Sequence, residues 1–145
     1  MKALLQRVKR ASVTVDGKLI SKINKGILIF LGVEKGDSEE NADKLSEKIT
    51  KLRIFEDEND KMNLSVTDVD GEILVVSQFT LCGDCKKGTR PSFDKAATPE
   101  IANELYEYFV KKLKEKNIKV QTGKFRAMMD VELVNDGPVT FWLEK

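Results

Sequence analysis

The chain of 145 residues contains no histidine, and it has only two cysteines and three prolines. Histidine is the commonest general base near neutral pH and the commonest metal ligand, so its absence removes many hydrolytic and metal-dependent chemistries. A Ser-His-Asp triad is excluded, and a nucleophilic hydroxyl would need a lysine or a carboxylate as its base. An excess of one charge is also lacking, because 25 basic residues are balanced by 24 acidic ones. Any attraction to nucleic acid must therefore come from a local patch.

The two cysteines, Cys82 and Cys85, form a single C-x-x-C motif. One chain lacks the second pair that a four-thiolate zinc site needs, although a dimer could supply it. Gly83 and the basic residues after Cys85 indicate a loop, whereas a thioredoxin-like motif opens a helix, so thiol redox chemistry is the less favoured hypothesis. We expect neither a metal nor a cofactor.

Long apolar runs are missing as well. No segment approaches the roughly 18 apolar residues of a membrane span, and the N-terminal residues turn charged before they form a signal-like run. We therefore expect a soluble cytoplasmic protein with no membrane partner. At this length, one domain over residues 1–145 is the default.

Hydrophobic patterning predicts a single α/β domain. Asp16-Gly17 supplies the turn of a β-hairpin, and the continuously apolar run 27–33 predicts a central strand that is covered on both faces. Asp37 and Glu40 predict a capping box at the start of the first helix. The predicted helices span 38–52 and 98–116, and the predicted strands lie near 3–15, 18–20, 27–33, 73–79, 128–134 and 139–143. Two helices and six or seven strands predict a mixed β-sheet with both helices packed on one side.

The strand predicted over 73–79 runs into Ser77, Gln78, Phe79 and Thr80. This end presents two hydroxyls and an amide that can both donate and accept hydrogen bonds. A polar, anionic ligand is one interpretation, and hydroxyls that merely satisfy loose backbone groups at a strand end are the simpler one.

Basic residues follow this strand end at Lys86, Lys87 and Arg90, which suffice for two or three phosphate contacts but not for sequence readout. Phe125 has basic neighbours on both sides, as in stacking sites for single-stranded RNA ends, although a lone phenylalanine is usually core. Lysines also gather at the end of the second predicted helix. They either contact RNA phosphates or face the negative end of the helix dipole, and the dipole is the simpler explanation.

Asp136-Gly137 lies between two apolar runs and is typical of a hairpin turn. Pro138 removes a hydrogen-bond donor just where the next strand would begin. On these residues alone we predict a turn, and nothing in the pattern requires the peptide bond before Pro138 to be cis.

Six short segments, colinear over essentially the whole chain, carry more information together than any one of them. They are Gln6-Arg7-Val8, Lys51-Leu52-Arg53-Ile54-Phe55, Lys61-Met62-Asn63, Ser77-Gln78-Phe79-Thr80, Arg90-Pro91-Ser92-Phe93 and Asn135-Asp136-Gly137-Pro138-Val139-Thr140. This set resembles the D-aminoacyl-tRNA deacylases, for which the Ser-Gln-x-Thr and Gly-Pro-x-Thr pair is specific. The resemblance implies a homodimeric esterase, without a cofactor, that hydrolyses D-aminoacyl-tRNA and also glycyl-tRNA mischarged on tRNA-Ala.

The resemblance also implies roles for individual residues. Gln78, Phe79 and Thr80 are similar to residues that line the substrate pocket. Gly137-Pro138 corresponds to a cis peptide that enters the partner subunit's site and excludes L side chains. Arg7 is similar to the arginine that holds this Gly-Pro loop, and Phe125 matches an aromatic near the terminal adenine. One departure is Arg126, which stands where the family commonly has glycine, so either the backbone there does not need positive φ or the loop is rearranged.

Two mechanisms follow for such an esterase. In one, Thr80 is the nucleophile. In the other, the vicinal 2′-hydroxyl of the tRNA assists or positions water, and Thr80 only orients the substrate. We favour the second, because no obvious base accompanies Thr80. The alternative of another class is a non-catalytic dimeric module that binds RNA 3′ ends. In both cases tRNA is the expected partner, and DNA is not.

Overall fold

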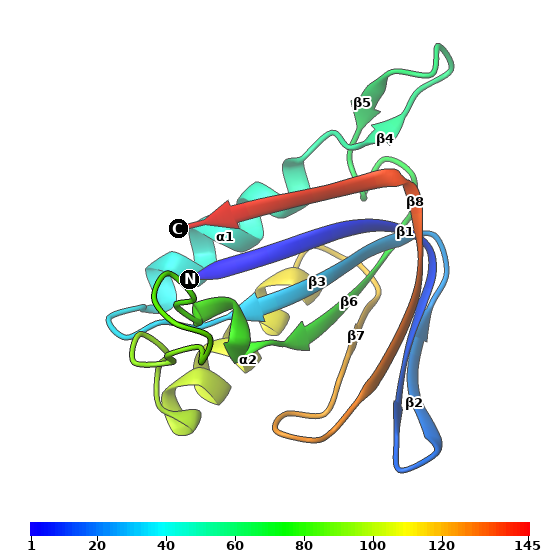
Figure 1. Ribbon diagram of the computed structural model, residues 1–145. Helices are drawn as coiled ribbons and strands as arrows, with labels where there is room; N and C mark the ends of the chain where they lie inside the picture. The colour runs from blue at the N-terminus through cyan, green and yellow to red at the C-terminus, as the bar shows by residue number, and fades with distance from the viewer.

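The computed structural model describes residues 1–145 and shows a curved, strand-rich sheet with two α-helices behind it (Figure 1). The strands are β1 (Lys2–Val15), β2 (Lys18–Ile23), β3 (Gly26–Gly32), β4 (Phe55–Glu56), β5 (Met62–Leu64), β6 (Glu72–Ser77), β7 (Val120–Thr122) and β8 (Asp130–Glu144). The helices are α1 (Glu39–Lys51), the 3₁₀ helix η1 (Phe79–Cys82) and α2 (Pro99–Lys114). Both α-helices lie within two residues of their predicted bounds. None of the helices combines the length and the apolar character that a membrane crossing requires.

The main sheet is mixed, as predicted. Its strands follow the order β2-β1-β3-β6-β7, and β8 pairs with β1. The β3–β6 and β6–β7 pairs are parallel, whereas β1 pairs antiparallel with β2, β3 and β8. The prediction of a central strand at 27–33 is confirmed, because Ile27, Leu28 and Ile29 in β3 are all 0% exposed.

Two apolar clusters explain why β3 is buried on both faces. Both α-helices pack on one face, where Leu45 of α1 and Phe109 of α2 join Ile29 of β3 in the larger cluster. The prediction that both helices cover one side is therefore confirmed. The smaller cluster lies on the opposite face, where Leu28 of β3 packs with residues of the curved ends of β1 and β2, and Leu133 of β8 packs against it. The sheet thus curls toward a barrel (Figure 1).

The predicted turn at Asp136-Gly137 is wrong. β8 continues through these residues, and both of its halves pair with β1. Gln6 pairs with Thr140 and Val8 pairs with Asn135, so four residues of β8 bulge opposite one residue of β1. The chain does not reverse here because the bent β1 offers a free edge to both halves of β8. Figure 1 shows the shared bend of the two strands.

Several shorter elements also differ from the prediction. β6 ends at Ser77, and the chain then turns into η1 rather than continuing as a strand through residue 79. The β4–β5 hairpin and β7 were not predicted. Each of these strands has only two or three residues, too few to show an alternating pattern.

The predicted capping box at Asp37 and Glu40 is also wrong by one residue. Helix α1 is capped at Ser38, whose backbone N–H donates to Asn41 Oδ1 at 2.9 Å. Asp37 is not available for capping because its Oδ2 accepts a hydrogen bond from the backbone N–H of Glu34 at 2.7 Å.

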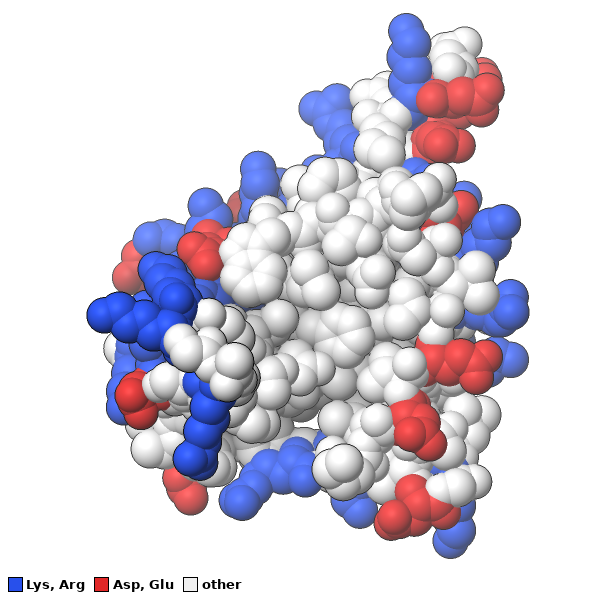
Figure 2. All heavy atoms as spheres, viewed as in Figure 1, with Lys and Arg blue, Asp and Glu red and all other residues white.

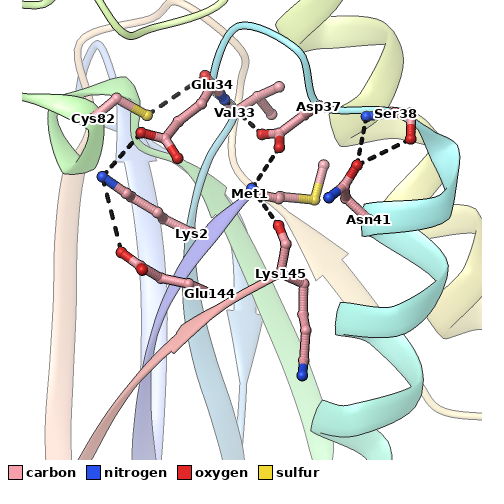
Figure 3. A network of polar contacts seen from close by, with 10 residues as sticks. All are labelled: Met1, Lys2, Val33, Glu34, Asp37, Ser38, Asn41, Cys82, Glu144 and Lys145. Carbon is pink, nitrogen blue, oxygen red and sulfur yellow. Dashed lines mark hydrogen bonds and ion pairs between the residues drawn. The ribbon is translucent and has the colours of Figure 1, made fainter.

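The second oxygen of Asp37 belongs to a network around the chain ends (Figure 3). The α-amino group of Met1 lies 2.6 Å from Asp37 Oδ1 and 2.6 Å from the carbonyl oxygen of Lys145. In the same view, Lys2 Nζ lies 3.0 Å from Glu34 Oε1. These contacts fasten the beginning of β1 and the end of β8 to the connection between β3 and α1.

Candidate functional site

A cavity of about 660 Å³ opens where β6 ends. It lies between η1, the start of α2 and the connection from β7 to β8. Ten of its fifteen lining residues are hydrophobic. They are listed here in chain order: Val33, Val76, Ser77, Gln78, Phe79, Thr80, Ala97, Pro99, Ala102, Phe125, Arg126, Ala127, Met128, Met129 and Val131. The structure thus brings the predicted residues 77–80 and Phe125 to one site.

The polar wall of this cavity is built by the turn from β6 into η1. The backbone N–H of Gln78 donates to Leu31 O of β3 at 2.8 Å, which fixes the end of the strand. The side-chain amide of Gln78 donates to Thr80 Oγ1. No titratable side chain hydrogen-bonds to Thr80, so its hydroxyl has no base to activate it.

The start of η1 also offers backbone donors. Leu81 is the first residue whose N–H donates to the carbonyl of Gln78, at 3.2 Å. The N–H groups of Phe79 and Thr80 precede this bond and have no partner within the helix, as at any helix start. A site that combines two such donors with an apolar wall can bind a carbonyl oxygen on which negative charge develops.

Aromatic side chains form part of the cavity wall. Phe79 is 55% exposed, and its ring meets Phe93 edge-on with centroids 5.0 Å apart. Phe125 is half-buried, and its ring centroid lies 6.1 Å from that of Tyr106. The Tyr106 hydroxyl donates to Val75 O at 2.8 Å, and burial raises the pKa of Tyr106 to about 12. Tyr106 is therefore a neutral support for Phe125 rather than an acid or a base.

Arg126 has φ +63°, so the backbone does adopt the left-handed conformation at the position where the resembled family commonly has glycine. This conformation is unfavourable for a residue with a Cβ. Arg126 nevertheless lines the cavity next to Phe125. The substitution thus leaves the local backbone in the geometry that a glycine would favour.

Arg7 lies away from the cavity, at the bend of β1 and β8. Its side chain is 5% exposed. Its Nε donates to Asp136 O at 3.0 Å, and its Nη1 donates to Ile54 O at 2.7 Å. On the other side of the bend, Asn135 Nδ2 donates to Arg7 O at 3.0 Å and to Val139 O at 2.9 Å. These four bonds hold the bulge of β8 in one conformation.

The Gly137-Pro138 peptide bond is cis, and both residues are exposed on this bulge. Gly137 has φ +141°, and an added Cβ would lie 2.5 Å from Val139 Cγ2, so only glycine fits there. Neither residue lines the cavity of its own chain. The single chain therefore does not bring the bulge and the cavity together.

The remaining predicted residues lie outside the cavity. Lys86, Lys87 and Arg90 are exposed on the loop after η1. Cys82 and Cys85 are both free thiols, the first buried and the second exposed. Burial raises the pKa of the Cys82 thiol, which disfavours the reactive thiolate that redox chemistry needs.

Sequence reasoning missed the far wall of the cavity, made by Ala97, Pro99, Met128 and Met129. These residues come from the start of α2 and from the β7–β8 connection, so no local pattern joins them. Met128 and Met129 were instead predicted to lie in a strand near 128–134, whereas β8 begins at Asp130 and Met128 is 91% exposed.

The family profile and the curated relatives agree with one another. The family profile described as D-Tyr-tRNA(Tyr) deacylase matches residues 4–144. A D-aminoacyl-tRNA deacylase of Geotalea daltonii is 62% identical over 144 residues, which cover 99% of this chain and 96% of that protein. A protein of the same name from Haemophilus influenzae is 62% identical over 143 residues, which cover 99% of each.

Two solved structures have the same fold. One, the c-Myc DNA Unwinding Element Binding Protein, is 44% identical with a TM-score of 0.94, over 100% of this chain and 99% of that chain. The other, a probable eukaryotic D-amino acid tRNA deacylase, has a TM-score of 0.81 over 99% of this chain and 98% of that chain. It is 16% identical, so this likeness concerns the fold alone.

Replacing Arg126 by glycine tests the backbone at the cavity rim. The left-handed conformation costs a residue with a Cβ about 1–2 kcal/mol, and glycine avoids this cost. Glycine in turn lowers stability by about 0.5–1 kcal/mol, because the unfolded chain gains conformational freedom. We expect Arg126→Gly to raise the free energy of unfolding in urea by up to about 1.5 kcal/mol. Met128→Gly, at a position with negative φ, should lower it. A destabilised Arg126→Gly would show that contacts of the arginine side chain outweigh the backbone cost.

Proposed function

The chain belongs to the D-Tyr-tRNA(Tyr) deacylase family, and from that premise we propose that it hydrolyses the ester bond of D-aminoacyl-tRNA. The products are the free D-amino acid and the tRNA. The observation that carries this function is the 62% identity to D-aminoacyl-tRNA deacylases over 99% of the chain, with an ester-sized cavity at Ser77-Gln78-Phe79-Thr80. A non-catalytic RNA-binding module is not favoured, because these relatives are named as enzymes.

The geometry of the cavity supports a mechanism without a protein nucleophile. An aminoacyl ester is intrinsically labile, so positioning it beside good donors lowers the barrier substantially. The N–H groups of Phe79 and Thr80 are suited to the developing oxyanion. Thr80 Oγ1 accepts from the Gln78 amide, which cannot remove a proton from it. The 2′-hydroxyl of the terminal ribose then assists or positions the attacking water, and Thr80 orients the ester.

Selection of the D enantiomer requires a group that blocks L side chains. We assign this role to Gly137-Pro138 of a second subunit, reaching into the cavity of the first. The cis bulge is exposed, rigidly held by Arg7 and Asn135, and unused by its own cavity. Glycine has no side chain to exclude, so the same site accepts glycyl-tRNA, including glycine mischarged on tRNA-Ala.

A homodimer fits the uncharged face of the sheet. Leu4 of β1 lies directly opposite Phe30 of β3 and Trp142 of β8. Cross-strand partners lie on the same face of a sheet, so these three side chains project from one face. The pair Gln6 and Thr140, two residues further along each strand, lies on that face as well. Trp142 is 46% exposed. Figure 2 shows a broad area without charge on the face away from the helices, in a chain of which 34% of residues are charged. Exposed uncharged areas of this kind mark association surfaces, and a second copy of the chain is the occupant we propose.

The substrate also suggests where the protein acts and what else it touches. A tRNA substrate places the activity in the cytoplasm, where aminoacyl-tRNA is used. Lys86, Lys87 and Arg90 are exposed on the loop that follows η1 and can contact tRNA phosphates without reading sequence. We propose no DNA partner and no metal or cofactor.

The direct test uses D-Tyr-tRNA and L-Tyr-tRNA with the purified protein. We expect hydrolysis of the D ester, and at least about a hundredfold lower rate for the L ester because its side chain is excluded sterically. Ester remaining after acid precipitation gives both rates. Unchanged levels of both esters would leave only binding, and equal hydrolysis of both would rule out chiral selection.

Replacing Thr80 by alanine separates the two mechanisms. We expect Thr80→Ala to keep most of kcat, because the hydroxyl only orients the ester. Removal of a true serine nucleophile lowers kcat by roughly 10⁶-fold in other hydrolases. Single-turnover rates on D-Tyr-tRNA measure the effect, and Thr67→Ala, at an exposed threonine outside the cavity, is the matched control. A near-total loss with folding and tRNA binding intact would contradict the assisted mechanism.

A charge placed on the uncharged face tests the dimer. We expect Trp142→Asp to yield monomers in sedimentation velocity, since an unpaired charge is costly in a buried interface. Deacylation should fall with dimer content although every residue of the cavity is retained. Leu19→Asp on β2, where leucine is 61% exposed, should leave both properties unchanged. A fully active monomer would refute the insertion of Gly137-Pro138 from a partner.

A further inference from the structure

A second, open groove of about 720 Å³ runs between the last turns of α2 and the segment that follows β7. Phe125 lines both this groove and the cavity at the end of β6, so the two meet at one aromatic ring. The mechanism described above uses only the cavity. The groove therefore continues the site on the side of Phe125 away from η1.

Three lysines line the groove, Lys111 and Lys114 from α2 and Lys124 from the chain just before Phe125. All three are exposed, and none forms an ion pair within 4.0 Å. Lys111 and Lys114 are three residues apart, so they share one face of the helix. Their charges are thus free to meet an anionic ligand.

Two glutamates, Glu107 and Glu115, also face the groove. Glu115 is already paired, because its Oε2 lies 3.3 Å from Lys112 Nζ. Glu107 accepts a hydrogen bond from Asn103 at 3.2 Å. The groove therefore contains three lysines without an ion pair and a single carboxylate without one. Its electrostatic potential favours binding of an anion.

Lys112 shows that these lysines are not equivalent. It also lies 3.5 Å from Asp43 Oδ1 of α1, and it faces that helix rather than the groove. Proximity to the negative end of the helix dipole is common to Lys111, Lys112 and Lys114. Helix stabilisation therefore does not explain why two of the three are left unpaired along a groove that leads to Phe125.

We infer that this groove binds the phosphodiester backbone of the nucleotides that precede the terminal adenosine of tRNA, with Lys111, Lys114 and Lys124 as the phosphate contacts. The inference rests on the proposed function: with the ester in the cavity, the terminal adenosine reaches Phe125, an aromatic ring of the cavity wall on which a base can stack. From that ring the groove offers the strand a path lined by Lys124 and by Lys111 and Lys114 of α2. Unpaired lysines in a groove that ends at an aromatic platform are the combination used for single-stranded nucleic acid.

The test compares two substrates of different length, D-Tyr-tRNA and 3′-(D-tyrosyl)adenosine. We expect Lys111→Gln/Lys114→Gln to raise KM for D-Tyr-tRNA about tenfold at low salt with kcat unchanged, and the effect to fade as salt rises. The dependence of log KM on log salt should fall by about 1.4 for two lost contacts to a single strand. KM for the adenosine ester should not change, because it has no preceding phosphates.

Lys116→Gln is the matched control, since it removes an exposed, unpaired charge just after the same helix but outside the groove. It should leave KM for both substrates unchanged, whatever it does to thermal stability. An unchanged KM for D-Tyr-tRNA in the double variant would contradict phosphate binding in the groove. An equal rise of KM for both substrates would contradict it as well.

Failure of the proposed function has a different signature. If the unmodified protein hydrolyses neither substrate, the deacylase assignment falls. In that case, fluorescence anisotropy with labelled tRNA that carries no amino acid still tests whether the groove binds phosphates. Weaker binding in the double variant than in Lys116→Gln supports the phosphate contacts, and equal binding refutes them.

Discussion

The pairing of β1 with β8 across a shared bend is the constraint on which the rest of the structure depends. Because β8 follows β1 along nearly its whole length, the second half of β1 and the first half of β8 curve together over the sheet and enclose the smaller cluster. That enclosure is why β3 is apolar on both faces. At the bend, Arg7 bonds the backbone oxygens of Asp136 and Ile54, so one buried guanidinium fixes the bulge and the root of the β4–β5 hairpin together.

Much of this fold could be predicted because its strongest signals are local. The turn at Asp16-Gly17 needs two positive φ angles, which the structure has. Helix α2 begins with proline at its first residue and has a buried stripe through Leu105 and Phe109. Such features depend only on neighbouring residues, so they can be predicted from the sequence.

The errors fall where distant segments decide. Asp136-Gly137 is a good hairpin sequence, but the free edge of β1 offers both halves of β8 a partner, and this tertiary pairing prevails over the local preference. Likewise, β6 ends at Ser77, where its pairing with β3 also ends at Leu31, and no pattern around residue 78 indicates this end. The residues of the cavity follow the same division. The wall at 77–80 is one continuous segment and was identified, whereas the wall that includes Ala97 and Met129 is assembled from separate elements.

The absence of histidine acquires a structural meaning from this arrangement. A site without a general base must obtain its rate from placement of the ester and from fixed backbone donors, and both require a rigid wall. The turn at Gln78 supplies that rigidity from within the chain. Selectivity, however, needs a second wall that is equally fixed, and the rigidly bonded bulge at Gly137 lies outside its own cavity. Catalysis and selectivity are then separate properties of two surfaces. In the dimer that we propose, selection between D and L esters arises only where those two surfaces meet, which would make association of two chains part of the chemistry.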